Sequence, residues 1–314
     1  MDSLLGIGLV SRRTGLTQHV IRIWERRYGA VKPDRTATKR RRYSVGDLER
    51  LNLLSLLTRS GHGIGSVAGM PTASLRELVG GLSGKAAPAP ASPVETKLVE
   101  SFIEECVAAI RSFDGGRLQA ALRHLETRLG AHGSLQRGVA PLVCIVGELW
   151  RMGDVTVAHE HFASVEIRRF LSSATRSYAQ GESAPLLLVA TPAGQLHELG
   201  ALLASSAAGN MGWRVVHLGV GLPAAEIAGA AVQSRARAVA LSLVHPEDDP
   251  ALGPELLKLR ELLPGEIPII IGGRAVRGYR DTVRRIKAIH LEDLGRFCAT
   301  LDKLRTLRPA GKGC

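Results

Sequence analysis

The sequence has few cysteines, no long apolar run and no secretory leader pattern. Its four cysteines (Cys106, Cys144, Cys298 and Cys314) form no CxxC pair, which argues against a zinc site or disulfide framework and suits a reduced cytoplasm. No stretch approaches the roughly 18–20 apolar residues of a membrane span. The first residues lack a cationic segment ahead of their short apolar run. We therefore expect a cytoplasmic protein that does not associate with membranes.

Acidic residues are also scarce relative to basic ones. The 314 residues include 29 Asp+Glu against 41 Lys+Arg, a formal net charge of +12. Residues 1–80 carry 14 basic and six acidic residues, a net +8, and the other 234 residues carry a net +4. A polyanionic partner is therefore expected at the first quarter of the chain.

Several catalytic patterns are missing as well. No P-loop or GxGxxG is present, which disfavours a nucleotide site. No general acid/base pair or activated nucleophile is visible, so we predict no enzyme activity. Apolar residues make up 45% and charged residues 22%, which is typical of a folded chain and excludes wholesale disorder.

Composition shifts divide the chain into parts. A Pro/Ala/Gly/Ser stretch from Gly80 to Pro93 cannot continue a helix and is expected to be a linker. A weaker boundary lies at Gln180–Pro185. The predicted division is a basic head (1–80), a linker (81–94), a helical domain (95–182), an α/β domain (183–308) and a tail (309–314).

The head is typical of a helix-turn-helix followed by a basic wing. Gly15 supplies the turn, and Thr17 is a good N-cap for a helix reaching Arg27. Arg and Gln on a short helix suit the DNA major groove, and a basic hairpin over Lys32–Ser44, with cations from Lys39 on, suits the phosphate backbone. The alternative is a solvated basic face on an ordinary three-helix domain. The candidate DNA-contacting residues are Thr17, Gln18, His19, Arg22, Arg26 and Arg27 on the helix and Arg40, Arg41, Arg42 and Tyr43 in the wing.

The last third alternates short apolar segments with amphipathic helices, which predicts an open, doubly wound parallel sheet. Ligands of such sheets bind beyond the carboxyl ends of the strands. His197, Ser242 and the Gly272-Gly273 pair all fall at those ends, where an imidazole is able to coordinate a metal; a lone loop histidine is otherwise a solvent-exposed polar residue. The five expected strands are Leu186–Ala190, Val215–Leu218, Ala238–Val244, Ile267–Ile271 and Lys287–Leu291, with a last helix near 293–306.

The middle of the chain predicts four amphipathic helices with short loops, a small four-helix bundle. Its unusual segment contains Trp150 and then His159, Glu160 and His161. Taken alone, Trp150 is expected in the core and the charged trio on a solvated face.

Three segments of the head resemble the winged-helix head of MerR-type regulators: Val10–Gly15, Val20–Gly29 with its WERRYG wording, and Arg40–Leu54. Ser60–Met70 is similar to the next helix-turn segment of that family. The resemblance implies binding to double-stranded operator DNA as a dimer of heads. The chain lacks the downstream cysteines of that family's metal sensors, so its effector is read elsewhere.

The tail resembles the DxHxxG…SxL…GG signature of cobalamin-binding domains, in QLHELG at 195–200, SLV at 242–244 and GG at 272–273. The resemblance implies a cobalt ion with His197 as its lower axial ligand, in place of the cofactor's own base. Gln195 replaces the usual acid; its oxygen is expected to accept the imidazole N–H without adding charge, which weakens ligation. An unloaded or repurposed pocket is the alternative. The residues implied to hold the displaced tail are Gly200, Ser242, Val244, Gly272 and Gly273.

Trp150, nine intervening residues and Glu160-His161 are similar to the Wx9EH motif of light-sensing MerR relatives of the CarH/LitR class. The resemblance implies that Trp150 packs on an adenosyl group, Glu160 bonds its ribose hydroxyls and His161 helps close the cavity. Light sensors of this class often have a histidine after the Trp that takes the upper cobalt position after photolysis. Arg151 stands there instead, which leaves His159, His161 or water for that position.

Together these resemblances predict a light-responsive, adenosylcobalamin-dependent regulator, a repressor. It is expected to bind operator DNA as a dimer or tetramer in the dark and to release it when light breaks the cobalt–carbon bond. One alternative is a light-independent regulator that senses another cobalamin form or another tetrapyrrole such as a bilin. Another is the corrinoid carrier of a methyltransferase system.

Overall fold

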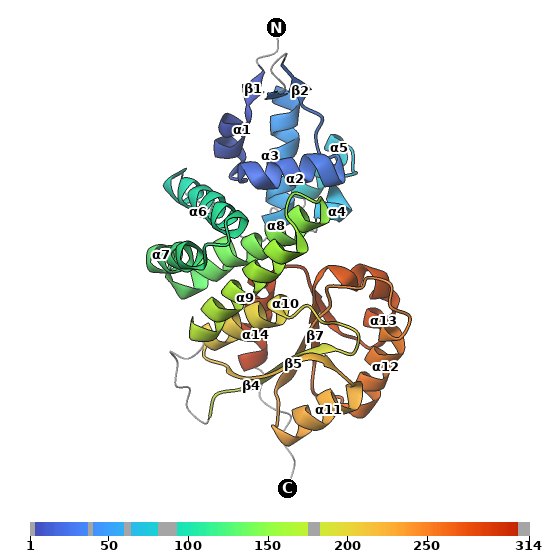
Figure 1. Cartoon of the computed structure of the whole chain (residues 1–314). Helices are drawn as coiled ribbons and strands as arrows, with labels where there is room; N and C mark the ends of the chain where they lie inside the picture. Colours follow the sequence, from blue (N-terminus) through green and yellow to red (C-terminus); the bar gives the residue numbers. More distant parts are fainter. Residues whose placement is uncertain (1–3, 37–39, 60–63, 81–92, 175–182, 307–314) are drawn as a thin grey trace. The chain divides into compact units, whose positions relative to one another are not determined.

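The computed structural model of the chain (Figure 1) describes residues 4–36, 40–59, 64–80, 93–174 and 183–306. They divide into two compact units, Met1–Ala121 with Pro141–Glu160, and Leu122–Ala140 with His161–Cys314. No helix in these ranges is long and apolar enough to cross a membrane. The predicted linker falls almost wholly outside the described residues, as do Lys39, the start of the Ser60–Met70 segment, residues 180–182 and the tail.

The head has the predicted helix-turn-helix and wing. Helix α2 (Gln18–Tyr28) begins at Thr17, whose Oγ1 accepts a hydrogen bond from the Val20 N–H at 3.2 Å, and Gly15 forms the preceding turn at φ 65°. Strands β1, β3 and β2 form a three-stranded antiparallel sheet that contains the wing. The remaining elements are β1 (Leu5–Gly6), α1 (Ile7–Thr14), β2 (Asp34–Arg35), β3 (Arg41–Tyr43), α3 (Val45–Arg59), α4 (Ile64–Val67) and α5 (Thr72–Gly80).

The middle of the chain contains the four predicted helices, with one difference. The expected short loop between the second and third helices is absent: a π-helical segment, Leu135–Val139, runs directly into the third helix. The break lies earlier, at Gly130, whose φ of 69° is non-helical and suits a residue without Cβ. The helices are α6 (Pro93–Arg111), α7 (Gly115–Ser134), α8 (Ala140–Arg151) and α9 (Val157–Ala174).

The last part is the predicted parallel sheet, with all five predicted strands present. The strand order is β5-β4-β6-β7-β8, and every neighbouring pair is parallel. β5 is added on one side of β4, and β6 and the later strands are added on the other. The topological switch point therefore lies between β4 and β6. The strands are β4 (Leu186–Pro192), β5 (Arg214–Leu222), β6 (Ala238–Ser242), β7 (Ile269–Gly272) and β8 (Ile289–Leu291); the helices are α10 (Leu199–Asn210), α11 (Ala224–Gln233), α12 (Leu252–Leu262), α13 (Arg280–Arg285) and α14 (Leu294–Thr306).

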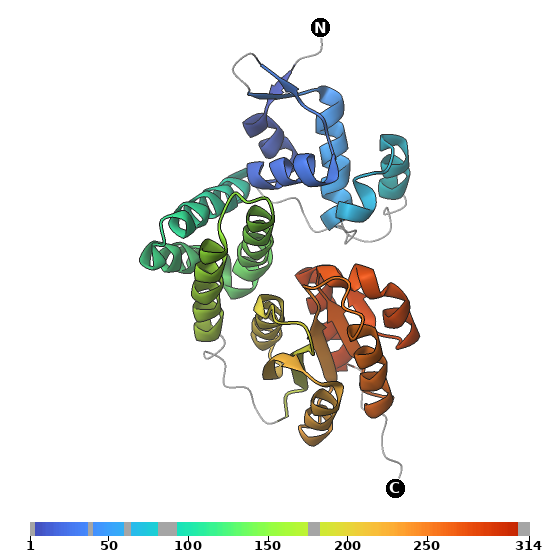
Figure 2. The same ribbon diagram turned by 45° about the vertical axis from the view of Figure 1, so that its right-hand side comes forward.

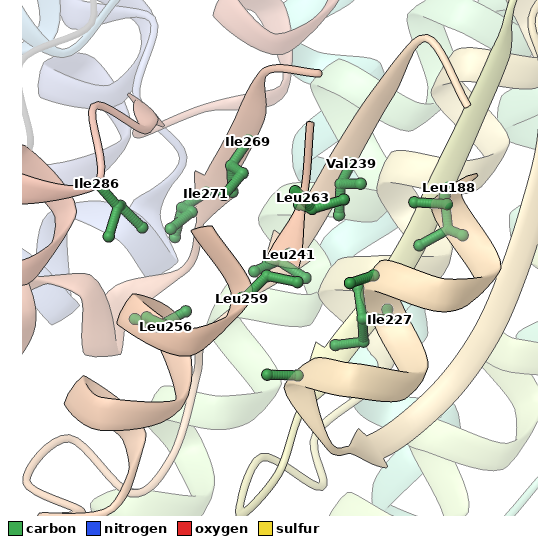
Figure 3. Packing of buried hydrophobic residues seen from close by; sticks show 14 of the residues in the cluster. Leu188, Ile227, Val239, Leu241, Leu256, Leu259, Leu263, Ile269, Ile271 and Ile286 are labelled. Atoms are coloured by element: carbon green, nitrogen blue, oxygen red, sulfur yellow. The ribbon is translucent and has the colours of Figure 1, made fainter. Parts of the chain in front are cut away.

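The two faces of this sheet differ in what they bury. On one face, large aliphatic side chains such as Leu188, Leu241 and Ile271 pack with Ile227 of α11 and Leu256 of α12 in one core cluster (Figure 3). Helix α10 lies on the opposite side of the sheet from α12 and α13 (Figure 2). Because strand side chains alternate, the α10 face receives the other residues of each strand.

Candidate functional site

His197 lies in the loop immediately before α10, at the carboxyl end of the sheet, and is half-buried. Its ring meets that of His245 edge-to-face, with ring centroids 5.7 Å apart and planes at 78°. The described residues contain no cluster of three or more His, Cys, Asp or Glu side chains able to hold a metal ion.

Gln195 is buried and fixes the loop that follows β6. Its Oε1 accepts hydrogen bonds from the backbone N–H groups of Val244 at 2.7 Å and His245 at 3.0 Å, and its Nε2 donates to the Pro246 carbonyl at 3.1 Å. The acceptor directions of Oε1 are thus occupied by backbone donors. The expectation that Gln195 accepts the His197 N–H is corrected by this geometry: Gln195 organises the loop that carries His245.

Three predicted residues come together where α10 begins. A Cβ on Gly200 would strike the Ser242 Oγ and would lie 3.9 Å from the Val244 Cγ2. Gly272 pairs in register with Ser242 and therefore lies on the same face. This end of the α10 face thus carries little side-chain volume.

Gly273 has a different role from Gly272. Its φ is 104°, and a Cβ there would collide with the Leu243 carbonyl oxygen. The requirement for glycine at this position thus comes from the backbone of the chain itself.

One polar residue on the α10 face was not predicted. His217 of β5 pairs in register with Val189, and its Nδ1 lies 3.2 Å from the Ser205 Oγ of α10. Its Nε2 is buried and has no hydrogen-bond partner among the described residues. Burial lowers the pKa of His217 below its ordinary value. The only signal in the sequence is a polar residue within an apolar strand.

The Trp150 motif is divided between the two units. Trp150 and Glu160 belong to the first unit, whereas His161 belongs to the second, with His197. Trp150 is half-buried at the end of α8, unlike Trp24 and Trp213, which are 7% and 0% exposed. The core position that Trp150 alone suggested is therefore not what the structure shows.

The histidine and arginine beside this motif have partners of their own. The Nδ1 of His159 accepts from the Thr156 N–H at 3.2 Å, and its Nε2 lies 3.3 Å from the Arg111 carbonyl oxygen. Its ring stacks on Phe113 with centroids 4.4 Å apart. Both ring nitrogens of His159 are therefore engaged. Arg151 forms an ion pair with Glu148 at 3.6 Å.

The wing presents two of its four predicted residues to solvent. Arg40 and Arg42 are exposed, and the Arg41 Nε pairs with the Glu25 Oε2 at 2.6 Å. Tyr43 is wholly buried in the core of the head, and burial raises the pKa of Tyr43 to about 12. The expectation that Tyr43 faces DNA is therefore corrected: it supports the wing from beneath.

The predicted recognition helix makes ion pairs with the helical part of its own unit. The Arg26 Nη1 lies 3.2 Å from the Asp154 Oδ2, and Arg27 pairs with Glu148. Glu148 is thus shared by Arg27 and Arg151. Burial, followed by the nearby Arg22 charge, lowers the pKa of His19. Gln18 accepts from Arg22 at 3.4 Å.

Both ends of this chain are similar in sequence to known protein families. Residues 6–73 match the MerR HTH family regulatory proteins, and residues 185–296 match the B12 binding domain. The HTH-type transcriptional repressor CarH of Myxococcus xanthus is 32% identical over 94% of this chain and 98% of its own length. The repressor CarA of the same organism is 28% identical over 96% and 97%.

A solved structure shares the fold. The monomethylamine corrinoid protein of Methanosarcina barkeri superposes with a TM-score of 0.52 at 15% identity, over 66% of this chain and 98% of its own. The residues present also fit a corrinoid: an imidazole at the strand ends, small residues on the α10 face, and a buried His217 nitrogen without a partner. The chain belongs to the MerR-type transcriptional regulators that carry a C-terminal B12-binding domain.

Proposed function

We propose that this protein is a light-responsive repressor that uses adenosylcobalamin. It holds operator DNA as a dimer or tetramer in the dark and releases the DNA after illumination. The observation that carries the proposal is that one chain combines a MerR head with a B12-binding domain. Two relatives named as repressors align with it over nearly their full lengths. The role of the protein is that of a ligand switch with no catalytic step.

The cofactor supplies a cobalt–carbon bond that light cleaves, and the chain positions it. His197 would ligate the cobalt, and its ring packs edge-to-face on that of His245, whose loop is held by Gln195. Gly200, Ser242, Val244 and Gly272 would hold the nucleotide tail, and Gly273 keeps the adjoining turn tight. By the motif that they resemble, Trp150, Glu160 and His161 would contact the adenosyl group. We propose the domain limits 1–80, 81–94, 95–182 and 183–308.

Glu148 joins the Trp150 segment to the recognition helix. It pairs with Arg151, next to Trp150, and with Arg27 of α2. Phosphates of DNA must replace Asp154 as the partner of Arg26, and Glu148 as the partner of Arg27, before these arginines contact DNA. A rearrangement at Trp150 that alters the Glu148 ion pairs therefore changes how readily Arg27 is released to bind DNA. Arg22, Arg40 and Arg42 supply further phosphate or base contacts.

Removing the Glu148 charge tests this link. We expect Glu148→Gln to raise the DNA affinity of the cofactor-loaded protein by about two- to fivefold, because a partly exposed ion pair is worth roughly 0.5–1 kcal/mol. The DNA is a duplex enriched from a random pool by the dark protein. Glu105→Gln, at an exposed pair with Arg117, is the matched control. Equal or weaker binding by Glu148→Gln would remove the link.

The light response is tested on the full chain reconstituted with adenosylcobalamin in the dark. Absorption spectra and size-exclusion profiles are recorded before and after green illumination, together with binding to the enriched duplex. We expect the spectrum to change, the oligomer to dissociate and DNA to be released. A cobalamin complex that binds DNA equally before and after light would indicate chemical sensing, and a complex without DNA binding would indicate a corrinoid carrier.

A further inference from the structure

A strongly basic segment follows β7. It runs over Arg274–Lys287 and contains a 3₁₀-helical stretch, Arg274–Tyr279, and then α13. Its 14 residues include six Arg or Lys and one acid, Asp281, a net +5. The 234 residues after the head carry a net +4, so the other 220 of them carry a net −1. The excess of positive charge beyond the head is therefore concentrated in this one segment.

The apolar residues of the segment anchor its backbone to the sheet. The Tyr279 hydroxyl also donates a hydrogen bond to the Asp249 carbonyl oxygen at 3.0 Å. A fixed backbone loses little conformational freedom when a partner binds to the side chains that it presents. The anchoring residues, all in the same aliphatic core cluster as Leu188 and Leu241, are Ala275, Val276, Tyr279, Val283 and Ile286.

Most cations of the segment are exposed and unneutralised. Arg284 pairs with Asp281, but both side chains are at least 80% exposed, so water screens this pair strongly. Arg274 pairs with Glu247 at 3.6 Å. The other four cations are exposed and form no ion pair with any residue in the described ranges. These four, which we call the basic patch, are Arg277, Arg280, Arg285 and Lys287.

Two charges of the basic patch act on the same point. Burial lowers the pKa of His290 in β8, the edge strand of the sheet, and the Glu292 carboxylate raises it. The positive charges of Arg280 and Arg277 lower this pKa further, as does that of Arg296 in α14. Like charges held this close together repel one another. A bound anion would relieve the repulsion.

The position of the basic patch separates it from the proposed cofactor site. Helix α13 lies on the opposite side of the sheet from α10 (Figure 2), whereas the small residues that would hold the nucleotide tail lie on the α10 face. Arg and Lys side chains bind DNA phosphates without reading sequence. A duplex held by the head is tethered to the same chain, which raises its effective concentration at the basic patch. A second copy of this chain, with a net charge of +12, is a poorer partner.

We propose that the basic patch binds the phosphate backbone of duplex DNA beside the segment that the head recognises. The inference extends the proposed function and rests on DNA binding by the head, which the test below measures separately. It assigns to the B12-binding domain a second role, that of adding affinity without adding sequence specificity. Because phosphate contacts release counterions, this added affinity is expected to depend strongly on salt.

The test compares two duplexes by titration of the cobalamin-loaded full chain in the dark. The short duplex carries only the consensus of the enriched pool, and the long duplex adds about 20 base pairs, two helical turns, on each side. The patch variant combines Arg277→Gln, Arg280→Gln and Arg285→Gln. On the long duplex it is expected to lower the slope of log K against log salt by about 2–3, since each phosphate contact contributes about 0.9. On the short duplex its affinity should match wild type within about twofold.

A control variant removes the same charge from exposed positions outside the segment. It combines Arg123→Gln, Arg128→Gln and Lys303→Gln and is expected to keep the wild-type slope on both duplexes. Circular dichroism checks that each variant folds. Hydroxyl-radical cleavage of the long duplex maps the contact: backbone protection beside the consensus is expected with wild type and the control variant, and is expected to vanish with the patch variant.

Three results would overturn the inference while leaving the head intact. They are equal slopes for wild type and the patch variant on the long duplex, equal effects of the patch and control variants, and equal losses by the patch variant on both duplexes. Size-exclusion of the patch variant adds a fourth: loss of the dark oligomer with an unchanged slope would assign the basic patch to a contact between copies. Failure of wild type to bind either duplex would overturn the proposed function itself.

Discussion

The two faces of the parallel sheet are built from alternate residues of the same strands, yet they serve different ends. On β6, Val239 and Leu241 enter the large aliphatic core, whereas Ala240 and Ser242 face α10. The helices differ in the same way, because α11 and α12 contribute Ile227 and Leu256 to the core and α10 reads LGALLASSAAGN. One face therefore buries large aliphatic side chains, and the other buries small and polar ones.

The largest expected effect comes from truncating one side chain in the aliphatic core. Leu241→Ala is expected to lower the free energy of unfolding by about 2–5 kcal/mol, because Leu241 is 3% exposed and its loss leaves a cavity. Urea unfolding of the full chain measures it. Ala240→Ser, one residue away on the α10 face, is the control and should cost less than about 2 kcal/mol. Similar losses for both substitutions would contradict the difference between the faces.

The next effect concerns the loop at the end of the α10 face. Gln195→Ala removes three hydrogen bonds from the backbone of residues 244–246 and is expected to cost about 1–3 kcal/mol of stability. Adenosylcobalamin affinity should fall as well, since His245 would lose its anchor. Gln233→Ala, at an exposed position at the end of α11, serves as the control. An unchanged unfolding midpoint and affinity would show that Gln195 is dispensable.

Filling the α10 face at Gly200 should affect both cofactor binding and the fold, because a Cβ there would lie against the Ser242 Oγ. Gly200→Val is expected to weaken adenosylcobalamin binding by about 10–100-fold, because its side chain would meet Ser242 and Val244 where little space remains. Gly229→Val in α11 has the same cost in helix propensity but meets nothing within 4 Å, so its affinity should match wild type. The account fails if both variants bind the cofactor alike.

The smallest effect is a pH dependence from His217, whose Nδ1 lies 3.2 Å from the Ser205 Oγ of α10. Burial lowers the pKa of His217, opposed by the Glu198 carboxylate. As pH falls through the ordinary histidine value of 6.5, the unfolded chain takes up a proton that the folded chain takes up less readily, so stability falls. We expect the melting temperature of wild type to fall slightly more between pH 7.5 and 5.5 than that of His217→Gln. Parallel pH profiles would contradict this.

Local patterns were sufficient to predict much of this molecule. Apolar runs gave the five strands, and Thr17 marked the start of the recognition helix, because alternation and capping depend on neighbouring residues. Tyr43 was misplaced because its burial depends on how β3 packs on the rest of the head. The role of Gln195 depends on backbone groups about 50 residues away, and that of His217 depends on its contact with Ser205 of α10. No local pattern reveals such partners.

The most direct test of the central claim is electron paramagnetic resonance of the full chain loaded with cob(II)alamin. Ligation by His197 predicts that ¹⁵N labelling of histidine converts the nitrogen splitting of the cobalt signal from triplets to doublets, and that His197→Ala abolishes the doublets. A splitting that stays a triplet after labelling would mean that the cofactor keeps its own base. The α10 face would then not hold the nucleotide tail.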